Sequence, residues 1–244
     1  VLLPDPGWGV MRTVAERQGA LVEPYPLEEK GGWVIDAEAI VERMDEKTKL
    51  VVVNSPSNPT GATLSKKGFS LLMEKAQEKG IFVLSDEVYH NYVYEGEHAS
   101  ALSCGSLDNL IFINSFSKTF AVTGWRLGYA IADPWIIRQM GIFKESISLC
   151  SFSIGQWAMS EFLNKSDAYL NKAREFCRAN MERMVARLSA IPGVRCTPPS
   201  GGFYVFADFS AIEPSSQNLF KRLLDAGVAV VPGVFFGSKG EGRA

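Results

Sequence analysis

Short β-rich apolar runs alternate with amphipathic stretches along the first half of the chain, and this alternation constrains the fold more than any other feature. Four such runs lie at residues 50–54, 81–84, 110–114 and 127–132. Between the first two, residues 65–79 carry apolar side chains at helical spacing, and Gly80 ends that stretch. Strands that alternate with helices predict an α/β fold, with a mostly parallel sheet covered by helices on both faces.

The pattern changes after Pro134. Residues 136–190 are almost entirely helical in pattern, and residues 167–188 suit one long helix. Beyond Pro192, β-rich runs at 194–197, 203–209 and 228–231, with a helix at 216–226, predict a smaller α+β domain. We therefore expect a large sheet domain over 1–137, a helical segment over 138–190 and a small domain over 191–244. Both ends look cut, so we expect the large domain to be incomplete at its N-terminus and the small one at its C-terminus.

Charge and composition disfavour several classes of protein. With 25 basic and 27 acidic residues the formal net charge is −2, so we expect neither nucleic acid nor an anionic membrane as a partner. No apolar run approaches the roughly 20 residues that span a bilayer. The four cysteines are widely spaced, which favours reduced thiols in a cytoplasmic protein, and the two histidines form no metal-ligand pattern.

Polar clusters follow three of the predicted strands, at residues 54–61, 85–89 and 115–119. In an open α/β sheet, ligands bind at the carboxyl ends of the strands. One such cluster is typical of an ordinary loop, but three together predict a binding site at this edge of the sheet.

Four motifs in these clusters resemble those of the PLP-dependent (pyridoxal 5'-phosphate-dependent) aminotransferase class I/II family. They are Asn-Pro-Thr-Gly at 58–61, Ser-Asp-Glu-Val-Tyr at 85–89, Ser-Phe-Ser-Lys at 115–118 and Gly-Trp-Arg-Leu-Gly at 124–128. Residues 4–8 and 199–204 add weaker matches, all in family order. The resemblance implies the aspartate aminotransferase fold (fold type I), with 1–137 as the PLP-binding large domain, and a homodimer.

The resemblance also implies three catalytic residues. Lys118 would hold PLP as a Schiff base and move a proton between the substrate Cα and the cofactor. Asp86 would face the pyridine nitrogen, and a carboxylate there makes the ring a better electron sink. Tyr89, one helical turn beyond Asp86, would bond the phenolic oxygen. The alternatives are a solvated surface lysine for Lys118, a helix N-cap for Asp86 and an ordinary half-buried tyrosine for Tyr89.

Five further residues complete the cofactor site that the resemblance implies. Asn58 would bond the phenolic oxygen, although its motif is also a good turn. Ser115, Ser117 and Arg126 would hold the phosphate. Arg126 could instead form a surface ion pair, but the apolar run after it predicts the start of a buried strand. Trp8 would stack on the ring or pack in the core.

Three parts of the family pattern are missing from this sequence, one of which is the set of C-terminal helices. A glycine-containing phosphate loop belongs before Pro4, and the arginine that binds the substrate carboxylate belongs just past Ala244. Arg243 stands two places early, so we do not assign it that role.

The chemistry that the resemblance implies is transamination, the exchange of an amino group between an amino acid and a 2-oxo acid. A carbon–sulfur β-lyase or a related synthase remains open on the same scaffold, as does a PLP-sensing domain of a transcription regulator. The sequence does not identify the amino donor.

Overall fold

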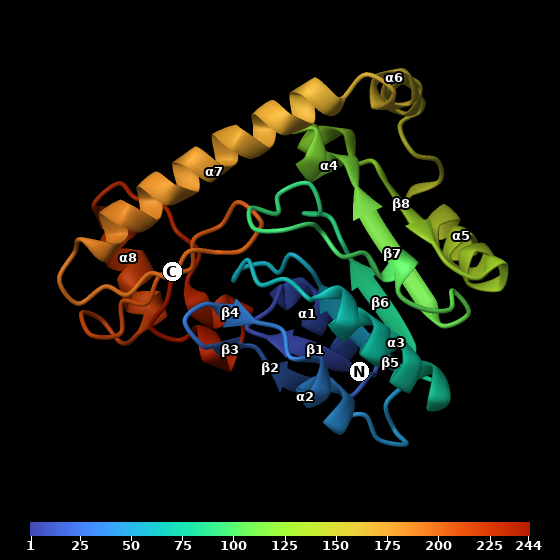
Figure 1. Cartoon of the computed structure of the whole chain (residues 1–244), viewed down its shortest axis with the longest axis horizontal. Coiled ribbons are helices and arrows are strands. Elements are labelled where there is room, and N and C mark those ends of the chain that lie inside the picture. The colour runs from blue at the N-terminus through green and yellow to red at the C-terminus, as the bar shows by residue number, and fades with distance from the viewer.

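A six-stranded sheet forms the centre of the computed structural model, which describes all residues from 1 to 244 (Figure 1). In spatial order the strands are β2 (Glu23–Pro26), β1 (Leu2–Asp5), β5 (Leu50–Asn54), β6 (Phe82–Asp86), β7 (Leu110–Ser115) and β8 (Gly128–Ile131). All neighbours pair in parallel except β8, which runs antiparallel to β7. The short strands β3 (Glu28–Glu29) and β4 (Trp33–Val34) form a separate hairpin. The predicted α/β fold with a mostly parallel sheet is confirmed.

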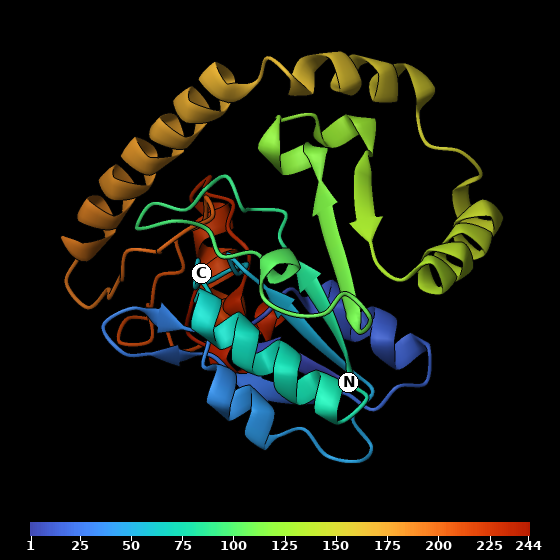
Figure 2. The same cartoon turned by 45° about the vertical axis from the view of Figure 1, so that its right-hand side comes forward.

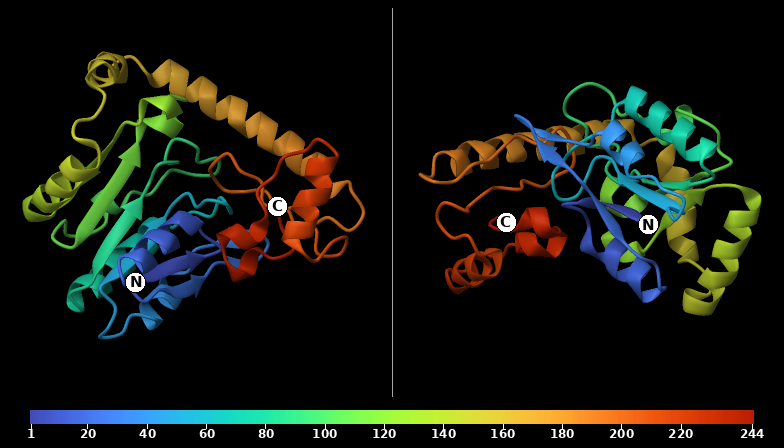
Figure 3. Two further views of the ribbon diagram at one scale, coloured as in Figure 1. Left: turned by 180° about the vertical axis from the view of Figure 1, so that it is seen from behind. Right: turned by 90° about the horizontal axis from the view of Figure 1, so that it is seen from below.

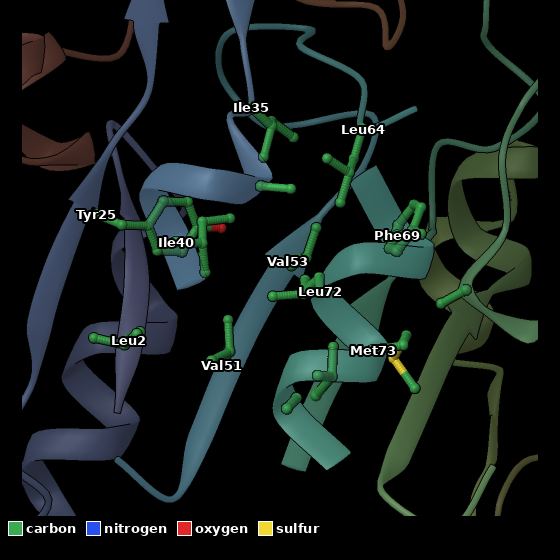
Figure 4. Packing of buried hydrophobic residues seen from close by; sticks show 14 of the residues in the cluster. Leu2, Tyr25, Ile35, Ile40, Val51, Val53, Leu64, Phe69, Leu72 and Met73 are labelled. Carbon is green, nitrogen blue, oxygen red and sulfur yellow. The ribbon is translucent and has the colours of Figure 1, made fainter. Parts of the chain in front are cut away.

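Helices cover both faces of this sheet because its strands are apolar on both sides (Figure 2). Val51 and Val53 lie in the main core with α2 (Ala37–Glu42) and α3 (Lys66–Glu78), as Figure 4 shows. Val52 points to the opposite face, where it lines a pocket with side chains of α1 (Gly9–Arg17). The Ser65 hydroxyl caps α3 by accepting from the Gly68 N–H at 3.1 Å.

Three helices run along the outside of the molecule (Figure 2): α5 (Pro134–Ser148), α6 (Ser153–Leu163) and α7 (Asp167–Ser189). The predicted long helix is confirmed by α7, which extends from beside α4 (Phe116–Thr119) to the C-terminal part of the chain (Figure 1). Large apolar side chains of α5 and α6, such as Phe143, Ile147 and Trp157, are exposed. None of the helices combines the length and the apolar character needed to cross a membrane.

The C-terminal part lies beside the β3–β4 hairpin (Figures 1 and 3). It contains the predicted helix, α8 (Ser216–Asp225), and two 3-10 turns, η3 (Gly233–Phe236) and η4 (Ser238–Gly240). Two further 3-10 turns, η1 (Ala101–Ser103) and η2 (Thr123–Trp125), lie earlier in the chain. The strands predicted at 194–197, 203–209 and 228–231 are wrong, because only isolated bridges form, such as that between Arg195 and Asp208. A strand requires a neighbour along its length, and here pairing is limited to single positions. The boundaries 1–137, 138–190 and 191–244 stay a prediction.

Candidate active site

The predicted polar clusters meet at one edge of the sheet because β5, β6 and β7 are parallel and end together. Asn54 and Asp86 are register partners at the carboxyl ends of β5 and β6. The Asn54 amide donates to the Asp86 carbonyl at 3.0 Å and accepts from the Asn58 N–H at 2.7 Å. Asn54, for which the sequence predicts no role, therefore joins two of the clusters.

Asp86 presents a buried carboxylate at this edge, with 8% of the residue exposed. Its Oδ1 accepts only the Val88 N–H, at 3.2 Å. Burial raises the pKa of Asp86 to about 6, Glu87 adds to the rise, and the nearby Lys118 opposes it. The bond to Val88 closes a local turn and no helix starts there, so the N-cap alternative does not account for the burial.

Tyr89 and Asn58 come together beside Asp86. Tyr89 is 3% exposed, and its hydroxyl lies 2.8 Å from the hydroxyl of Tyr204, for which the sequence also predicts no role. Burial raises the pKa of Tyr89, Tyr204 adds to the rise, and the Asn58 side chain lowers it. Asn58 Oδ1 is buried and has no hydrogen-bond partner within the protein.

Lys118 belongs to the four-residue helix α4 that follows β7 directly. Its side chain approaches Asp86 closely enough to lower the pKa of that carboxyl. Its backbone carbonyl accepts from the Tyr92 hydroxyl at 2.9 Å, a contact that the sequence did not indicate. Lys118 is half-buried, which disfavours the alternative of a solvated surface lysine.

Among the residues predicted to bind phosphate, Ser117 is buried, Ser115 is half-buried and Arg126 is exposed. The Ser115 hydroxyl accepts from the Ser117 N–H at 3.1 Å and donates to the Leu127 carbonyl at 3.1 Å. Arg126 is exposed, has a left-handed φ of 54°, and donates to the Thr123 carbonyl at 3.0 Å. No hydrogen bond joins it to either serine.

The expectation that Arg126 begins a buried strand is wrong. The strand that follows it, β8, is largely exposed because it is the last strand of the sheet and has only β7 as a neighbour. The alternative of a surface ion pair is not realised either, since the Arg126 side chain contacts a backbone carbonyl.

Trp8 is 39% exposed and meets Phe235 edge-on at 5.4 Å between ring centroids. Core packing therefore does not explain it. Trp8 and Asp86 line the same pocket of about 530 Å³, so an aromatic face and a carboxylate border one cavity. Arg243 lies elsewhere, 2.7 Å from Glu29 and stacked over the Trp33 ring at 4.9 Å, in agreement with its exclusion from the site.

These residues fit PLP. Besides Asn58 Oδ1, the hydroxyls of Ser57 and Thr119 are buried without partners in the protein, and Asp86 has a single backbone donor. Buried polar atoms in native proteins nearly always find partners, so the site has both hydrogen-bond donors and acceptors that are free to bind a ligand. A pyridine nitrogen and a phenolic oxygen are groups that would use it.

The comparisons with known proteins agree with this geometry. Residues 1–244 match the family Aminotransferase class I and II, and the chain belongs to that family. It is 38% identical over 228 residues to an aspartate/prephenate aminotransferase of Thermus thermophilus, covering 92% of this chain and 58% of that protein. It is 35% identical over 246 residues to an aspartate aminotransferase of Pyrococcus horikoshii, covering 99% of this chain and 63% of that protein.

The structural comparison gives the same result. The aspartate aminotransferase from Thermus thermophilus with maleate superposes with a TM-score of 0.93 at 35% identity, covering 99% of this chain and 64% of that one. An alanine aminotransferase from Pyrococcus furiosus superposes with a TM-score of 0.90 at 31% identity, covering 99% of this chain and 63% of that one. The chain thus spans about three fifths of the length of the relatives it matches.

Proposed function

We propose that this chain forms the cofactor-binding part of a PLP-dependent aminotransferase. The observation that supports this most strongly is that Asp86, Tyr89 and Lys118 lie together at the carboxyl ends of the strands. Asp86 is buried there, and the charge of the nearby Lys118 lowers its pKa. Such a carboxylate and amine are what PLP chemistry requires of a protein. The reaction proposed is exchange of an amino group between an amino acid and a 2-oxo acid.

Bound PLP would supply the electron sink that stabilises negative charge at the substrate Cα. Asp86 would hold a proton on the pyridine nitrogen, since an ion pair there removes the cost of its own burial. Lys118 would hold the cofactor covalently and, when released, move the proton at the substrate Cα. Trp8 would cover one face of the ring.

The remaining site residues would orient the cofactor. Asn58, through its amide N–H, and Tyr89, through its hydroxyl, would donate to the phenolic oxygen. Ser115, Ser117 and Arg126 would contact the phosphate, and for this the Ser115 hydroxyl must give up its bond to Leu127.

The substrates and partners also belong to this proposal. Relatives of this chain are named for aspartate, prephenate, aromatic amino acids and alanine, so the substrates are taken to be two small molecules, an amino acid and a 2-oxo acid. A homodimer is supported by the exposed apolar side chains of α5 and α6, which favour burial against another surface. A cytoplasmic location is supported by four free cysteines.

The test is to load the complete polypeptide with PLP, reduce it with borohydride and find the modified lysine by mass spectrometry. We expect one phosphopyridoxyl group, on Lys118. Lys118→Ala should remove the label, whereas Lys67→Ala, which changes an exposed lysine of α3, should leave it unchanged. Labels scattered over surface lysines in the unmodified protein would contradict the proposal.

A further inference from the structure

A hydroxyl from the C-terminal part of the chain reaches the candidate site. Tyr204 lies 115 residues beyond Tyr89 in sequence, yet the two hydroxyl oxygens are 2.8 Å apart. The two rings meet edge-on, with centroids 5.5 Å apart and planes at 82°. Phe203, beside Tyr204, meets Tyr89 in the same way at 5.2 Å. The Tyr89 ring therefore contacts two aromatic rings of this segment, and its hydroxyl has a partner there.

The direction of this hydrogen bond follows from the number of protons available. Each tyrosine has one proton and can also accept. If Tyr89 donates to Tyr204, it has no proton left for a phenolic oxygen of a ligand. If Tyr204 donates to Tyr89, the Tyr89 proton is free to point into the site.

We propose that Tyr204 is a positioning residue, which donates to the Tyr89 hydroxyl and thereby orients the Tyr89 proton toward the phenolic oxygen of PLP. This inference rests on the proposed function. It gives the segment at 199–204 a role in the cofactor site, in addition to the residues at the ends of the strands. It also links the C-terminal part of the chain to the cofactor through a single bond.

Two hydrogen bonds to the backbone of Gly202 fix the segment around Tyr204 in place. The Gly202 N–H donates to the Tyr92 carbonyl at 2.8 Å, and the Tyr94 hydroxyl donates to the Gly202 carbonyl. The Tyr94 bond offers a matched control. Tyr94→Phe removes one tyrosine hydroxyl that bonds the same segment, but it leaves the pair of Tyr89 and Tyr204 intact.

The test compares Tyr204→Phe, Tyr89→Phe, the double variant and Tyr94→Phe in the complete polypeptide loaded with PLP. The readout is the pH midpoint of the absorbance change of the bound cofactor, together with its dissociation constant. A donor to the phenolic oxygen favours the more negative form of the chromophore, so weakening that donor raises the midpoint. Thermal unfolding without PLP reports the structural cost separately.

We expect Tyr204→Phe to raise the midpoint by about 0.3–1 pH unit and to weaken PLP binding about 2- to 10-fold, the size of one neutral hydrogen bond. Tyr89→Phe should raise it further, and adding Tyr204→Phe to Tyr89→Phe should change nothing more. Tyr94→Phe should lower the unfolding temperature without moving the midpoint.

Two results would overturn the inference. One is a midpoint that Tyr204→Phe leaves unchanged while Lys118 is still labelled, and this would leave the proposed function standing. The other is an equal shift from Tyr204→Phe with and without the Tyr89 hydroxyl, which would mean that Tyr204 acts independently of Tyr89. Absence of any label on Lys118 would instead reject both the proposed function and this inference.

Discussion

The two ends of the candidate cofactor site differ in how completely this chain builds them. At the ring end, Asn58, Asp86 and Tyr89 are buried and lie on or beside strands in the middle of the sheet. At the phosphate end, Arg126 is exposed next to the edge strand β8, and the Ser115 hydroxyl is occupied by backbone groups. Central strands fix their side chains from both sides, whereas an edge strand does so from one side only. The ring end should therefore control the chemistry, and the phosphate end should mainly control affinity.

The largest effect is expected at the ring end, from Asp86→Asn. The amide keeps the shape but cannot hold a charged pyridine nitrogen, and removing one partner of a buried charge pair costs about 2–5 kcal/mol. The turnover of the complete, PLP-loaded protein should fall about 30- to 4,000-fold. Asp133→Asn is the control, because Asp133 caps α5 from an exposed loop and Asn is an equally good cap. A loss of less than tenfold in Asp86→Asn would break the contrast between the two ends.

The same carboxylate should make the stability of the PLP-free protein depend on pH. The folded-state pKa of Asp86 is raised to about 6 from 3.8, so the stability it contributes is present below pH 3.8 and is lost as the pH rises through about 6. That shift corresponds to about 3 kcal/mol. Denaturant unfolding of the parent and of Asp86→Asn should therefore diverge above pH 4, with the variant the more stable at pH 7. If the free energies of unfolding of the two proteins changed with pH in parallel, burial would not raise the pKa of Asp86.

The strands that carry the ring end could be predicted from the sequence because their signals are local. A β-branched run followed by a polar cluster specifies both a strand and what lies at its end, as in Leu50–Asn54. The errors occur where the outcome depends on distant neighbours. The runs near 203–209 have strand composition but only isolated pairing, and β8 is exposed because nothing lies beyond it. Tyr204 was not predicted as a site residue because its contact with Tyr89 spans 115 residues.

At the phosphate end, two substitutions of Arg126 separate affinity from stability. Arg126→Ala should weaken PLP binding about 10- to 150-fold, since a hydrogen bond to a charged group contributes about 1.5–3 kcal/mol. It should leave the PLP-free protein about as stable, because the side chain is exposed with one backbone contact. Arg126→Gly should bind PLP as weakly as Arg126→Ala, but be more stable by about 1 kcal/mol, because φ is 54° there and glycine adopts that conformation freely.

Binding titrations and denaturant unfolding of the two Arg126 variants check both statements. If Arg126→Ala bound PLP normally, other groups would hold the phosphate. Arg126 would then stay exposed in the complete protein and make no contact with the cofactor. If instead Arg126→Ala unfolded easily, the phosphate end would be as structurally integrated as the ring end, and the contrast between them would disappear.

The smallest effect is expected from Ser115→Ala, and it tests which task the Ser115 hydroxyl performs. As an N-cap of α4 that also bonds the Leu127 carbonyl, it should contribute about 1 kcal/mol to the free energy of unfolding without PLP. If that is its main task, Ser115→Ala should weaken PLP binding less than about threefold. Loss of a strong neutral hydrogen bond to PLP would instead weaken binding about tenfold. Ser115→Thr, which keeps the hydroxyl, serves as the control. A large loss of affinity with unchanged stability would mean that the hydroxyl turns from Leu127 to the phosphate, and that the phosphate end is completed only when the cofactor binds.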